Sequence, residues 1–341
     1  MKQTILVTGG TGYIGSWVVK YLLESGHNVR MPVRDLNNKE KYDFLVDISE
    51  LSPGKLELFE ADLLKMGSYD KAAEGCDTII HVASPFILKV KDPQKELVDP
   101  AVKGTENVLG AASRSKTVKK VVLTSSVAAV YGDNADMGEQ GLEILTEEHF
   151  NKTSSLSHQP YSFSKVEAEK KAWEIAGQQS QWKLVVLNPS FVVGPPLSTT
   201  TNSESIKLIN DILSGKLRTG VAELYFGFVD VRDVARAHIY CAENGAQGRH
   251  ILSERVTDLL SMVNIIRDYK GNEYKLPKSN NPKWLMGLIG GLFGITRKFV
   301  NRNIGIPLKL DSTKSREKLH LTYTPLEETM KDMVDKMSIM N

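Results

Sequence analysis

The chain has 341 residues, of which 41% are hydrophobic, so it is long enough to bury a substantial core and to form more than one lobe. Its 43 Lys and Arg balance 41 Asp and Glu to a formal charge of +2, and the two signs are mixed along the chain, which argues against a nucleic-acid-binding protein. Two cysteines, Cys76 and Cys241, lie far apart and outside any metal-ligand spacing, so we expect no disulfide, no metal site and a reducing, cytoplasmic location.

Neither a signal peptide nor a membrane span is expected. The N-terminus lacks the basic, apolar and small-residue order of a signal peptide, and its apolar run is typical of a buried strand. The apolar segment WLMGLIGGLFGI, residues 284–295, is shorter than the roughly 20 residues that cross a bilayer and is interrupted by glycines. We expect a helix that is buried in the fold or lines a pocket, with a surface or lipid contact as the alternative. The wider segment 279–306 is a candidate lid or pocket wall.

The first half of the chain alternates apolar, β-rich runs with helix-length stretches. The predicted strands are 4–9, 27–33, 56–62, 77–84, 119–126 and 183–190, and the predicted helices lie near 13–25, 38–49, 67–75, 94–115 and 162–179. Apolar runs without alternation indicate strands buried on both faces, as in a parallel sheet covered by helices. We therefore predict an α/β fold with a doubly wound parallel sheet of the Rossmann type, and a ligand crevice at the carboxyl ends of its strands.

The pattern loosens after about residue 190. The remaining segments are a helix over 204–215 closed by Gly215, a short strand leading into a helix within 226–245, and amphipathic helices at 259–269 and 325–337. These pieces are typical of a smaller, mixed lobe.

The segment VTGGTGYIGSWVV, residues 7–19, places four glycines between a predicted strand and a predicted helix. Its spacing satisfies both GxxGxxG and GxGxxG. In this context glycines permit a tight turn, a close approach of the backbone to a diphosphate, and close packing of helix on strand. The pattern predicts that a dinucleotide binds at this turn, through Gly9, Thr11, Gly12, Tyr13, Ile14 and Gly15.

The end of the second predicted strand indicates which dinucleotide binds. Arg34 stands 19 residues after Gly15, where an NAD-binding chain typically has a carboxylate. A guanidinium is suited to a 2′-phosphate, so NADP(H) is favoured over NAD(H). Because the adjacent Asp35 could bind a ribose 2′-hydroxyl, NAD(H) remains the alternative cofactor. Lys41 could add a second positive charge, or be an ordinary solvated lysine.

The third and fourth strand ends supply further candidate cofactor contacts. The carboxylate of Asp62 could accept a hydrogen bond from the adenine amino group while Leu63 packs near the ring; the alternative is a turn residue. The HVASP segment after the fourth strand would pass near the linking phosphates and ribose, which adds Val82, Ala83 and Ser84.

The segments TSS, 124–126, and YSFSK, 161–165, indicate the chemistry. Tyr161 and Lys165 lie four apart at a predicted helix start, so the ammonium could lower the phenol's pKa and hold the nicotinamide ribose while Tyr161 acts as general acid. Ser126 could donate a hydrogen bond to the same carbonyl oxygen. Ser125 is the competing serine, but its side chain should face the other side of the strand end.

From these patterns we predict two lobes. Residues 1–190 would bind NADP(H), with a return of the chain near 226–254, and residues 191–341 would bind a small-molecule carbonyl substrate. The helices near 94–115 and 162–179 could pair between two copies, so a monomer or a homodimer is expected.

The motifs resemble those of the extended short-chain dehydrogenase/reductases, essentially from end to end. VTGGTGYIGSWVV, HVASP, VVLTSSVAAVYG, NPSFVVGP and FVDVRDVARAH are most similar to the group of dihydroflavonol reductases, cinnamoyl-CoA reductases and yeast methylglyoxal reductases. The resemblance implies an oxidoreductase that reduces aldehydes or ketones with NADPH. It implies Ser126, Tyr161 and Lys165 as the catalytic residues. It also implies that Thr124, Pro189 and Val192 lie beside the nicotinamide.

Two departures leave the substrate open. HQPYSFSK, residues 158–165, differs from the NWYCYGK motif of cinnamoyl-CoA reductases, and Tyr131 stands where plant dihydroflavonol reductases have an asparagine. We expect a pocket lined by Phe86, Tyr131 and residues near Leu197 and Tyr225.

Three rival functions are compatible with the same fold. A nucleotide-sugar epimerase or dehydratase is disfavoured because Val127 and Ala128 replace the usual Asp-Glu pair of dehydratases, and Arg34 replaces the acid of NAD-dependent epimerases. A 3β-hydroxysteroid dehydrogenase-like oxidation would use the same residues in reverse. A nonenzymatic NADP sensor would have no use for Tyr161 and Lys165.

Overall fold

A seven-stranded parallel sheet forms the centre of the computed structural model, which describes residues 2–83, 90–201, 203–293 and 295–340. The strand order is β10-β6-β5-β4-β1-β2-β3, and every neighbouring pair is parallel. The predicted doubly wound sheet is thereby confirmed. Its strands are β1 (Thr4–Thr8), β2 (Asn28–Val33), β3 (Lys55–Glu60), β4 (Thr78–His81), β5 (Lys120–Thr124), β6 (Lys183–Pro189) and β10 (Gly248–Leu252).

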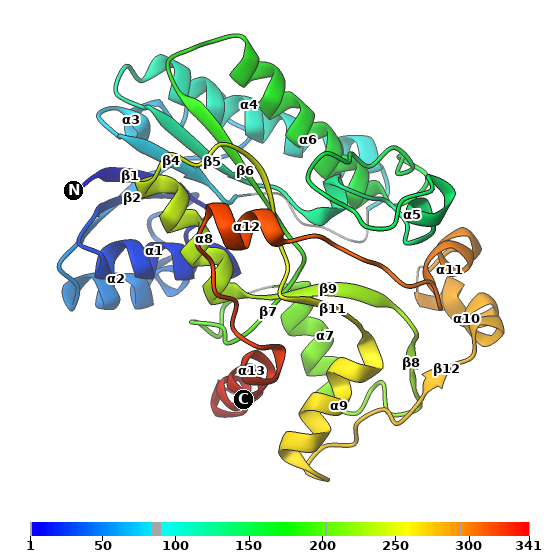
Figure 1. Cartoon of the computed structure of the whole chain (residues 1–341). Helices are drawn as coiled ribbons and strands as arrows, with labels where there is room; N and C mark the ends of the chain where they lie inside the picture. Colours follow the sequence, from blue (N-terminus) through cyan, green and yellow to red (C-terminus); the bar gives the residue numbers. More distant parts are fainter. Residues whose placement is uncertain (1, 84–89, 202, 294, 341) are drawn as a thin grey trace.

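Helices cover both faces of this sheet (Figure 1). One face packs against α1 (Tyr13–Glu24), α2 (Asp43–Glu50) and α8 (Val231–Glu243). The other face packs against α3 (Asp70–Ala73), α4 (Asp99–Arg114) and α6 (Pro160–Gly177). A π-helical turn over Gln94–Val98 leads directly into α4. The fully buried apolar runs of β1 and β4 supply the middle of both hydrophobic cores, as parallel strands with two covered faces require.

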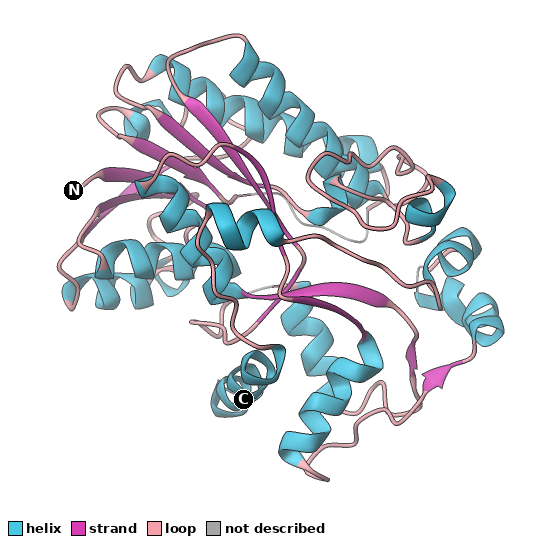
Figure 2. Cartoon of the chain, viewed as in Figure 1, coloured by secondary structure: helices cyan, strands magenta, loops and turns pink. Residues whose placement is uncertain are grey.

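A smaller lobe follows β6 and has its own core (Figure 2). Its three-stranded sheet has the order β11-β9-β7, from β7 (Phe191–Val193), β9 (Tyr225–Asp230) and β11 (Arg255–Asp258). A two-stranded pair joins β8 (Val221–Ala222) to β12 (Asn280–Asn281). The helices that pack here are α7 (Glu204–Leu213), α9 (Leu259–Lys270) and α13 (Leu326–Met340). Gly215 follows α7 with a positive φ of 75°, as expected of a helix-closing glycine.

The remaining helices are short. They are the 3-10 helices η1 (Lys39–Lys41), η3 (Val127–Ala129) and η4 (Gly290–Phe293), and α5 (Ala135–Glu139), α10 (Lys283–Ile289), α11 (Arg297–Asn303) and α12 (Thr313–Lys318).

Several sequence-based expectations differ from the structure. The strand β3 is not buried on both faces: it is the edge strand, and most of its residues are exposed or partly exposed. The single helix expected over 38–49 is divided into η1 and α2, and only four residues of 67–75 form a helix. Within 284–295, Met286 is buried, but Trp284 and Leu288 are 68% and 67% exposed, so the expectation of a buried helix is wrong for them.

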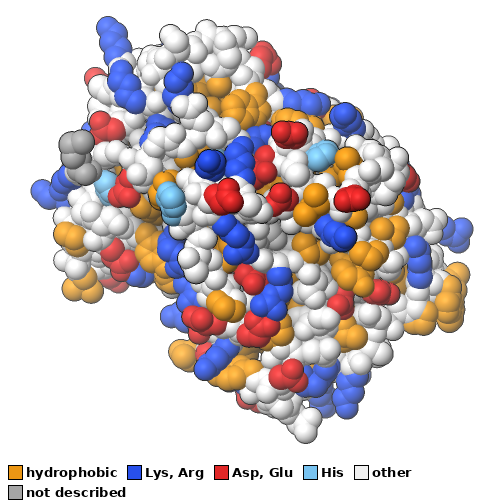
Figure 3. Space-filling model, in the orientation of Figure 1, with side chains coloured by type: hydrophobic (Ala, Val, Ile, Leu, Met, Phe, Trp, Pro, Cys, Tyr) orange, Lys and Arg blue, Asp and Glu red, His pale blue; other side chains and the backbone are white. Residues whose placement is uncertain are grey.

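Acidic and basic side chains are interspersed over the face shown in Figure 3, as the balanced composition indicates. Within the described part of the chain, no helix is both long and apolar enough to cross a membrane.

Asp230 joins the two lobes. It lies at the end of β9, caps α8 by accepting the backbone N–H of Arg232 at 2.7 Å, and accepts the Thr329 hydroxyl of α13 at 2.8 Å. The Arg232 guanidinium bonds the same carboxylate at 2.7 Å and also Asp332 of α13 at 2.7 Å. One buried carboxylate therefore ties a helix on the large sheet to the C-terminal helix of the small lobe.

Asp230→Ala should lower the free energy of unfolding by about 3 kcal/mol, because it removes a helix cap and leaves the partly buried Arg232 without one of its carboxylates. Asp70→Ala is the matched control: its pair with Arg114 is about half exposed, and its loss should cost less than about 1 kcal/mol. Chemical denaturation of both variants compares them. Equal losses would contradict the role assigned to Asp230.

Candidate active site

One cavity of about 1040 Å³ lies at the carboxyl ends of the central strands, between the large sheet and the small lobe. The loops after β1, β2, β4, β5 and β6 all contribute to its wall, as expected where parallel strands end. Ser84 lies outside the described residues. Every other residue predicted to bind the cofactor or to take part in catalysis lines this cavity: Gly9, Thr11, Gly12, Tyr13, Ile14, Gly15, Arg34, Lys41, Asp62, Leu63, Val82, Ala83, Thr124, Ser126, Tyr161, Lys165, Pro189 and Val192.

The glycine-rich turn forms one end of the cavity. Gly9 has a φ of +68°, and a Cβ there would lie 2.8 Å from the backbone of Ala83. A Cβ on Gly15 would lie 2.0 Å from the carbonyl oxygen of Gly9. Gly12 caps α1 without a side-chain hydrogen bond, so the first backbone N–H groups of the helix stay available to an anion. This turn fits a diphosphate, and side chains at these positions would fill the space.

Cationic side chains line the cavity beside β2. Arg34 and Lys41 are exposed along its rim. Asp35 lines the same region, but its Oδ1 accepts the backbone N–H of Asn37 at 2.8 Å and the side-chain amide of Asn37 at 3.1 Å. The carboxylate of Asp35 therefore closes a turn, while Arg34 is an exposed cation in the cavity lining.

Asp62 is a turn residue that also lines the cavity. It lines the cavity, and its Oδ1 also accepts the backbone N–H of Leu64 at 2.7 Å, as a turn residue does. Leu63 packs on α4 so closely that a Cβ on Gly104 would lie 2.1 Å from its Cδ2.

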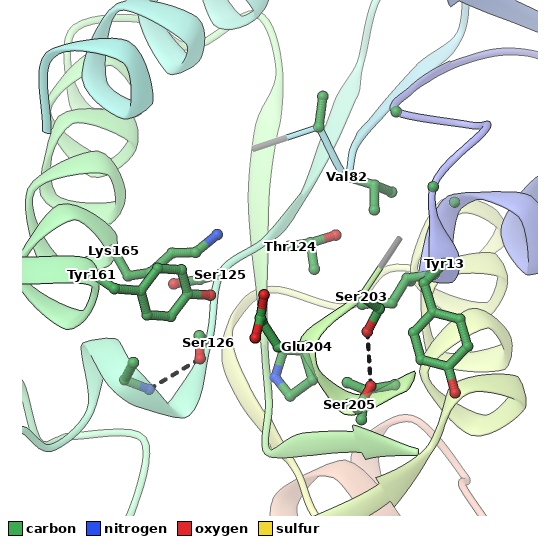
Figure 4. A pocket seen from close by; sticks show the side chains of 18 of the residues that line it. Tyr13, Val82, Thr124, Ser125, Ser126, Tyr161, Lys165, Ser203, Glu204 and Ser205 are labelled. Carbon is green, nitrogen blue, oxygen red and sulfur yellow. Dashed lines mark hydrogen bonds between the residues drawn. The ribbon is translucent and has the colours of Figure 1, made fainter. Parts of the chain in front are cut away.

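Tyr161 and Lys165 project from the first turns of α6, with the lysine Nζ 5.7 Å from the centre of the tyrosine ring (Figure 4). Burial lowers the pKa of Lys165 to about 8, against the opposing effect of the Glu169 carboxylate. Burial raises the pKa of Tyr161 above its usual value. The expected lowering of this pKa by the ammonium is therefore not seen, because desolvation of the phenolate dominates. Both side chains are protonated at neutral pH.

Gln159 fixes the start of α6. It has a φ of +54°, uncommon for a residue other than glycine, and it directly precedes Pro160. Its side-chain amide donates to the carbonyl oxygen of Gly132 at 2.6 Å and to Asp133 at 2.5 Å. These bonds hold an unfavourable backbone conformation in place one residue before the tyrosine helix begins.

The two serines after β5 have different surroundings. Ser125 is buried, and its hydroxyl donates to Glu169 at 2.5 Å. Ser126 is partly exposed to the cavity, caps η3, and accepts the backbone N–H of Ala128 at 3.1 Å. A hydroxyl that accepts one hydrogen bond can still donate its own proton. In Figure 4 the Tyr161 hydroxyl is directed into the opening, and the Ser126 hydroxyl is drawn on its hydrogen bond to η3.

Thr124 contacts a buried histidine. His238 Nδ1 lies 2.7 Å from the carbonyl oxygen of Val234 and must donate to it, so its Nε2 accepts the Thr124 hydroxyl at 2.7 Å. Burial lowers the pKa of His238 to about 4, so the ring is neutral and this tautomer is fixed. Thr124 is thereby held beside the cavity.

A comparison with protein families identifies the fold's relatives. The model of the NAD dependent epimerase/dehydratase family matches residues 5–252. The chain belongs to this family. The match covers the large sheet, the cavity's glycine turn and the Tyr161–Lys165 helix.

Among curated proteins, similar members of the family are plant reductases. The cinnamoyl-CoA reductase CAD2 of Medicago truncatula is 36% identical over 99% of this chain and 96% of its own length. The anthocyanidin reductase of Arabidopsis thaliana is 38% identical over 72% of this chain and 74% of its own. The resemblance to the dihydroflavonol and cinnamoyl-CoA reductase group is confirmed by these relatives.

A solved structure from the same family covers nearly all of both chains. Gre2 of Candida albicans, in complex with NADPH, matches with a TM-score of 0.80 and 31% identity over 99% of each chain. Yeast methylglyoxal/isovaleraldehyde reductase Gre2 complexed with NADPH matches with a TM-score of 0.77 and 26% identity, over 98% of this chain and 97% of that one.

The sequence predicted only part of the remaining cavity wall. Tyr131 and Tyr225 line the cavity as expected, Phe86 lies outside the described residues, and Leu197 packs instead against the core beside α1. The missed lining residues come from separate loops and helix ends: Asn134, Gln159, Ser203, Glu204, Ser205, Leu224, Phe299 and Asn303. Figure 4 shows the Glu204 carboxylate directed into the opening. Ser203, Glu204 and Ser205 are consecutive, and Phe299 and Asn303 lie four apart on α11, but only the tertiary fold brings these separate groups together.

Proposed function

We propose that this chain is an NADPH-dependent reductase that converts an aldehyde or a ketone to an alcohol. The observation that carries the proposal is one cavity lined by the glycine turn at one end and by Ser126, Tyr161 and Lys165 at the other. The NADPH bound to the two Gre2 structures and the reductase activities named for the plant relatives support it.

The cavity residues suit NADPH along its length. The Gly9–Gly15 turn and the start of α1 would bind the diphosphate, and Arg34 with Lys41 would bind the 2′-phosphate. Asp62 and Leu63 would contact the adenine, and Val82 and Ala83 the linking ribose. At the other end, the nicotinamide would lie beside Thr124, Pro189 and Val192.

Bound NADPH would supply the hydride for the carbonyl carbon. Tyr161 carries its proton at neutral pH and would donate it to the carbonyl oxygen as negative charge develops there. Ser126 would donate a hydrogen bond to the same oxygen. Lys165 would hold the nicotinamide ribose, and its positive charge would stabilise the phenolate that remains.

We also propose a division of the chain into two domains. We assign residues 1–190 to cofactor binding, with the chain returning to the large sheet through α8 and β10, and residues 191–341 to substrate binding. We also propose a cytoplasmic protein, monomeric or homodimeric; the buried, unpaired thiols of Cys76 and Cys241 fit a reducing compartment.

Tyr161→Phe should leave NADPH binding near the wild-type level and lower kcat by about 100-fold or more, because the general acid is lost. Ser126→Ala should also lower kcat, by about 10- to 100-fold. Ser125→Ala is the matched comparison, since its hydroxyl faces Glu169, and it should lower kcat less than Ser126→Ala does. Turnover is followed by loss of NADPH absorbance with small aldehydes, α-dicarbonyls and aryl ketones. Undiminished turnover by Tyr161→Phe would refute the assigned acid.

Arg34→Ala should reduce the preference for NADPH over NADH by about 10- to 100-fold, because a charged hydrogen bond to the 2′-phosphate is worth about 1.5–3 kcal/mol. The change should appear in kcat/KM for NADPH, while kcat/KM for NADH stays nearly constant. Lys39→Ala, an exposed lysine of the same turn outside the cavity lining, serves as control. An unchanged preference would assign 2′-phosphate binding elsewhere.

The value of kcat/KM for NADPH should fall as the pH rises through about 8, because the Lys165 ammonium with a pKa of about 8 then loses its proton. Below this pH Lys165 is positively charged, and its titration should leave kcat/KM for NADPH unchanged. Tyr161 does not cause this fall of kcat/KM at high pH (the basic limb of the profile), since its pKa is raised. Lys165→Met should remove the limb along with most of the activity. A wild-type profile that stays flat to about pH 9.5 would contradict the assignment.

A further inference from the structure

A buried carboxylate lies behind the proposed catalytic residues. The side chain of Glu169, on α6, has no exposed surface. It accepts hydrogen bonds from the Ser125 hydroxyl at 2.5 Å, the Asn188 amide at 2.9 Å and the Arg249 Nε at 2.6 Å. The Trp173 indole lies 3.3 Å away as a further donor. A buried anion with this many donors remains charged in the interior.

Arg249 brings the compensating charge from β10. Its side chain is 7% exposed and stacks on the ring of Phe150, with 4.0 Å between the guanidinium carbon and the ring centre. Its remaining N–H groups donate to three backbone carbonyl oxygens: those of Glu147 at 2.6 Å, His149 at 2.5 Å and Ala129 at 3.3 Å. The guanidinium therefore joins two loops to the large sheet.

Some of these partners are linked to the proposed catalytic residues. Ser125 directly precedes Ser126, and Ala129 donates its backbone N–H to the Ser126 carbonyl oxygen at 2.9 Å, closing the turn that Ser126 caps. The loop held through His149 leads to Tyr161. Lys165 lies one helical turn before Glu169 on α6.

We propose that the buried Glu169–Arg249 pair is a positioning unit for Ser126, Tyr161 and Lys165, fixing the two loops and supplying the negative charge behind the lysine. Neither residue is among the described residues that line the large cavity, so the pair acts through others and does not contact the substrate. The inference deepens the proposed reductase function and rests on it.

The electrostatic part can be separated from simple packing. Titratable groups that the described structure places beside Lys165 include Tyr161 and Glu169 from its own helix and His81 from β4. Burial keeps His81 neutral, with its pKa lowered to about 3. Glu169 is an anion that raises the pKa of Lys165, against the effect of burial. Removing its charge should therefore make Lys165 lose its proton at lower pH.

The test compares Glu169→Gln with the double variant Glu169→Gln/Arg249→Met, which removes both charges and so avoids an unpaired buried guanidinium. We expect the pH midpoint above which NADPH binding weakens, measured by fluorescence titration, to move down by about one unit in both variants. At about pH 6, where Lys165 is protonated in every variant, kcat should still be lower by about 10- to 100-fold because the loops shift.

Glu167→Gln is the matched control: it removes one carboxylate from the same helix, but that carboxylate is 33% exposed and pairs with Lys170. Its midpoint and kcat should equal those of the wild type. A folded double variant with the wild-type midpoint and kcat within about twofold would overturn the proposal. If the wild type binds NADPH but reduces no carbonyl, the reductase function fails, while the midpoint shift still tests the effect of the pair on Lys165.

Discussion

The single direction of the central strands determines where everything else in the site lies. Because all seven strands are parallel, their carboxyl ends meet at one edge of the sheet, and each chain segment that leaves this edge can contribute to one cavity. The glycine turn follows β1, Arg34 follows β2, Val82 follows β4 and Ser126 follows β5. Residues more than 100 positions apart in sequence, such as Gly15 and Ser126, therefore converge on one cavity.

Burial then adjusts the chemistry of those residues. The same enclosure that raises the pKa of Tyr161 lowers that of Lys165, so both changes follow from one low-dielectric environment. The phenol is kept protonated as an acid requires, while the lysine is brought near the pH at which it loses its charge. A carboxylate close to the lysine limits the second effect, which explains why a fully buried Glu169 lies one turn further along the same helix.

Sequence reasoning succeeded where function depends on local spacing. The glycines of residues 9–15 and the Tyr161–Lys165 pair each lie within one turn or one helix, so their arrangement follows from backbone geometry alone. It failed where the outcome depends on neighbours in space. The pKa direction of Tyr161 depends on burial, the exposure of β3 depends on its edge position, and the approach of Asn303 to the cavity depends on how the small lobe packs.

The two lobes contribute different residues to the cavity wall. Most residues proposed to bind NADPH or to transfer the proton come from the large lobe, with Val192 from β7 of the small sheet. Glu204, Tyr225 and Phe299, which also line the cavity, come from α7, β9 and α11 of the later chain. Since separate segments form the two ends of one cavity, side chains of the later elements can change without disturbing the hydride-transfer geometry. The different substrates in the names of the plant relatives are what such a division would produce.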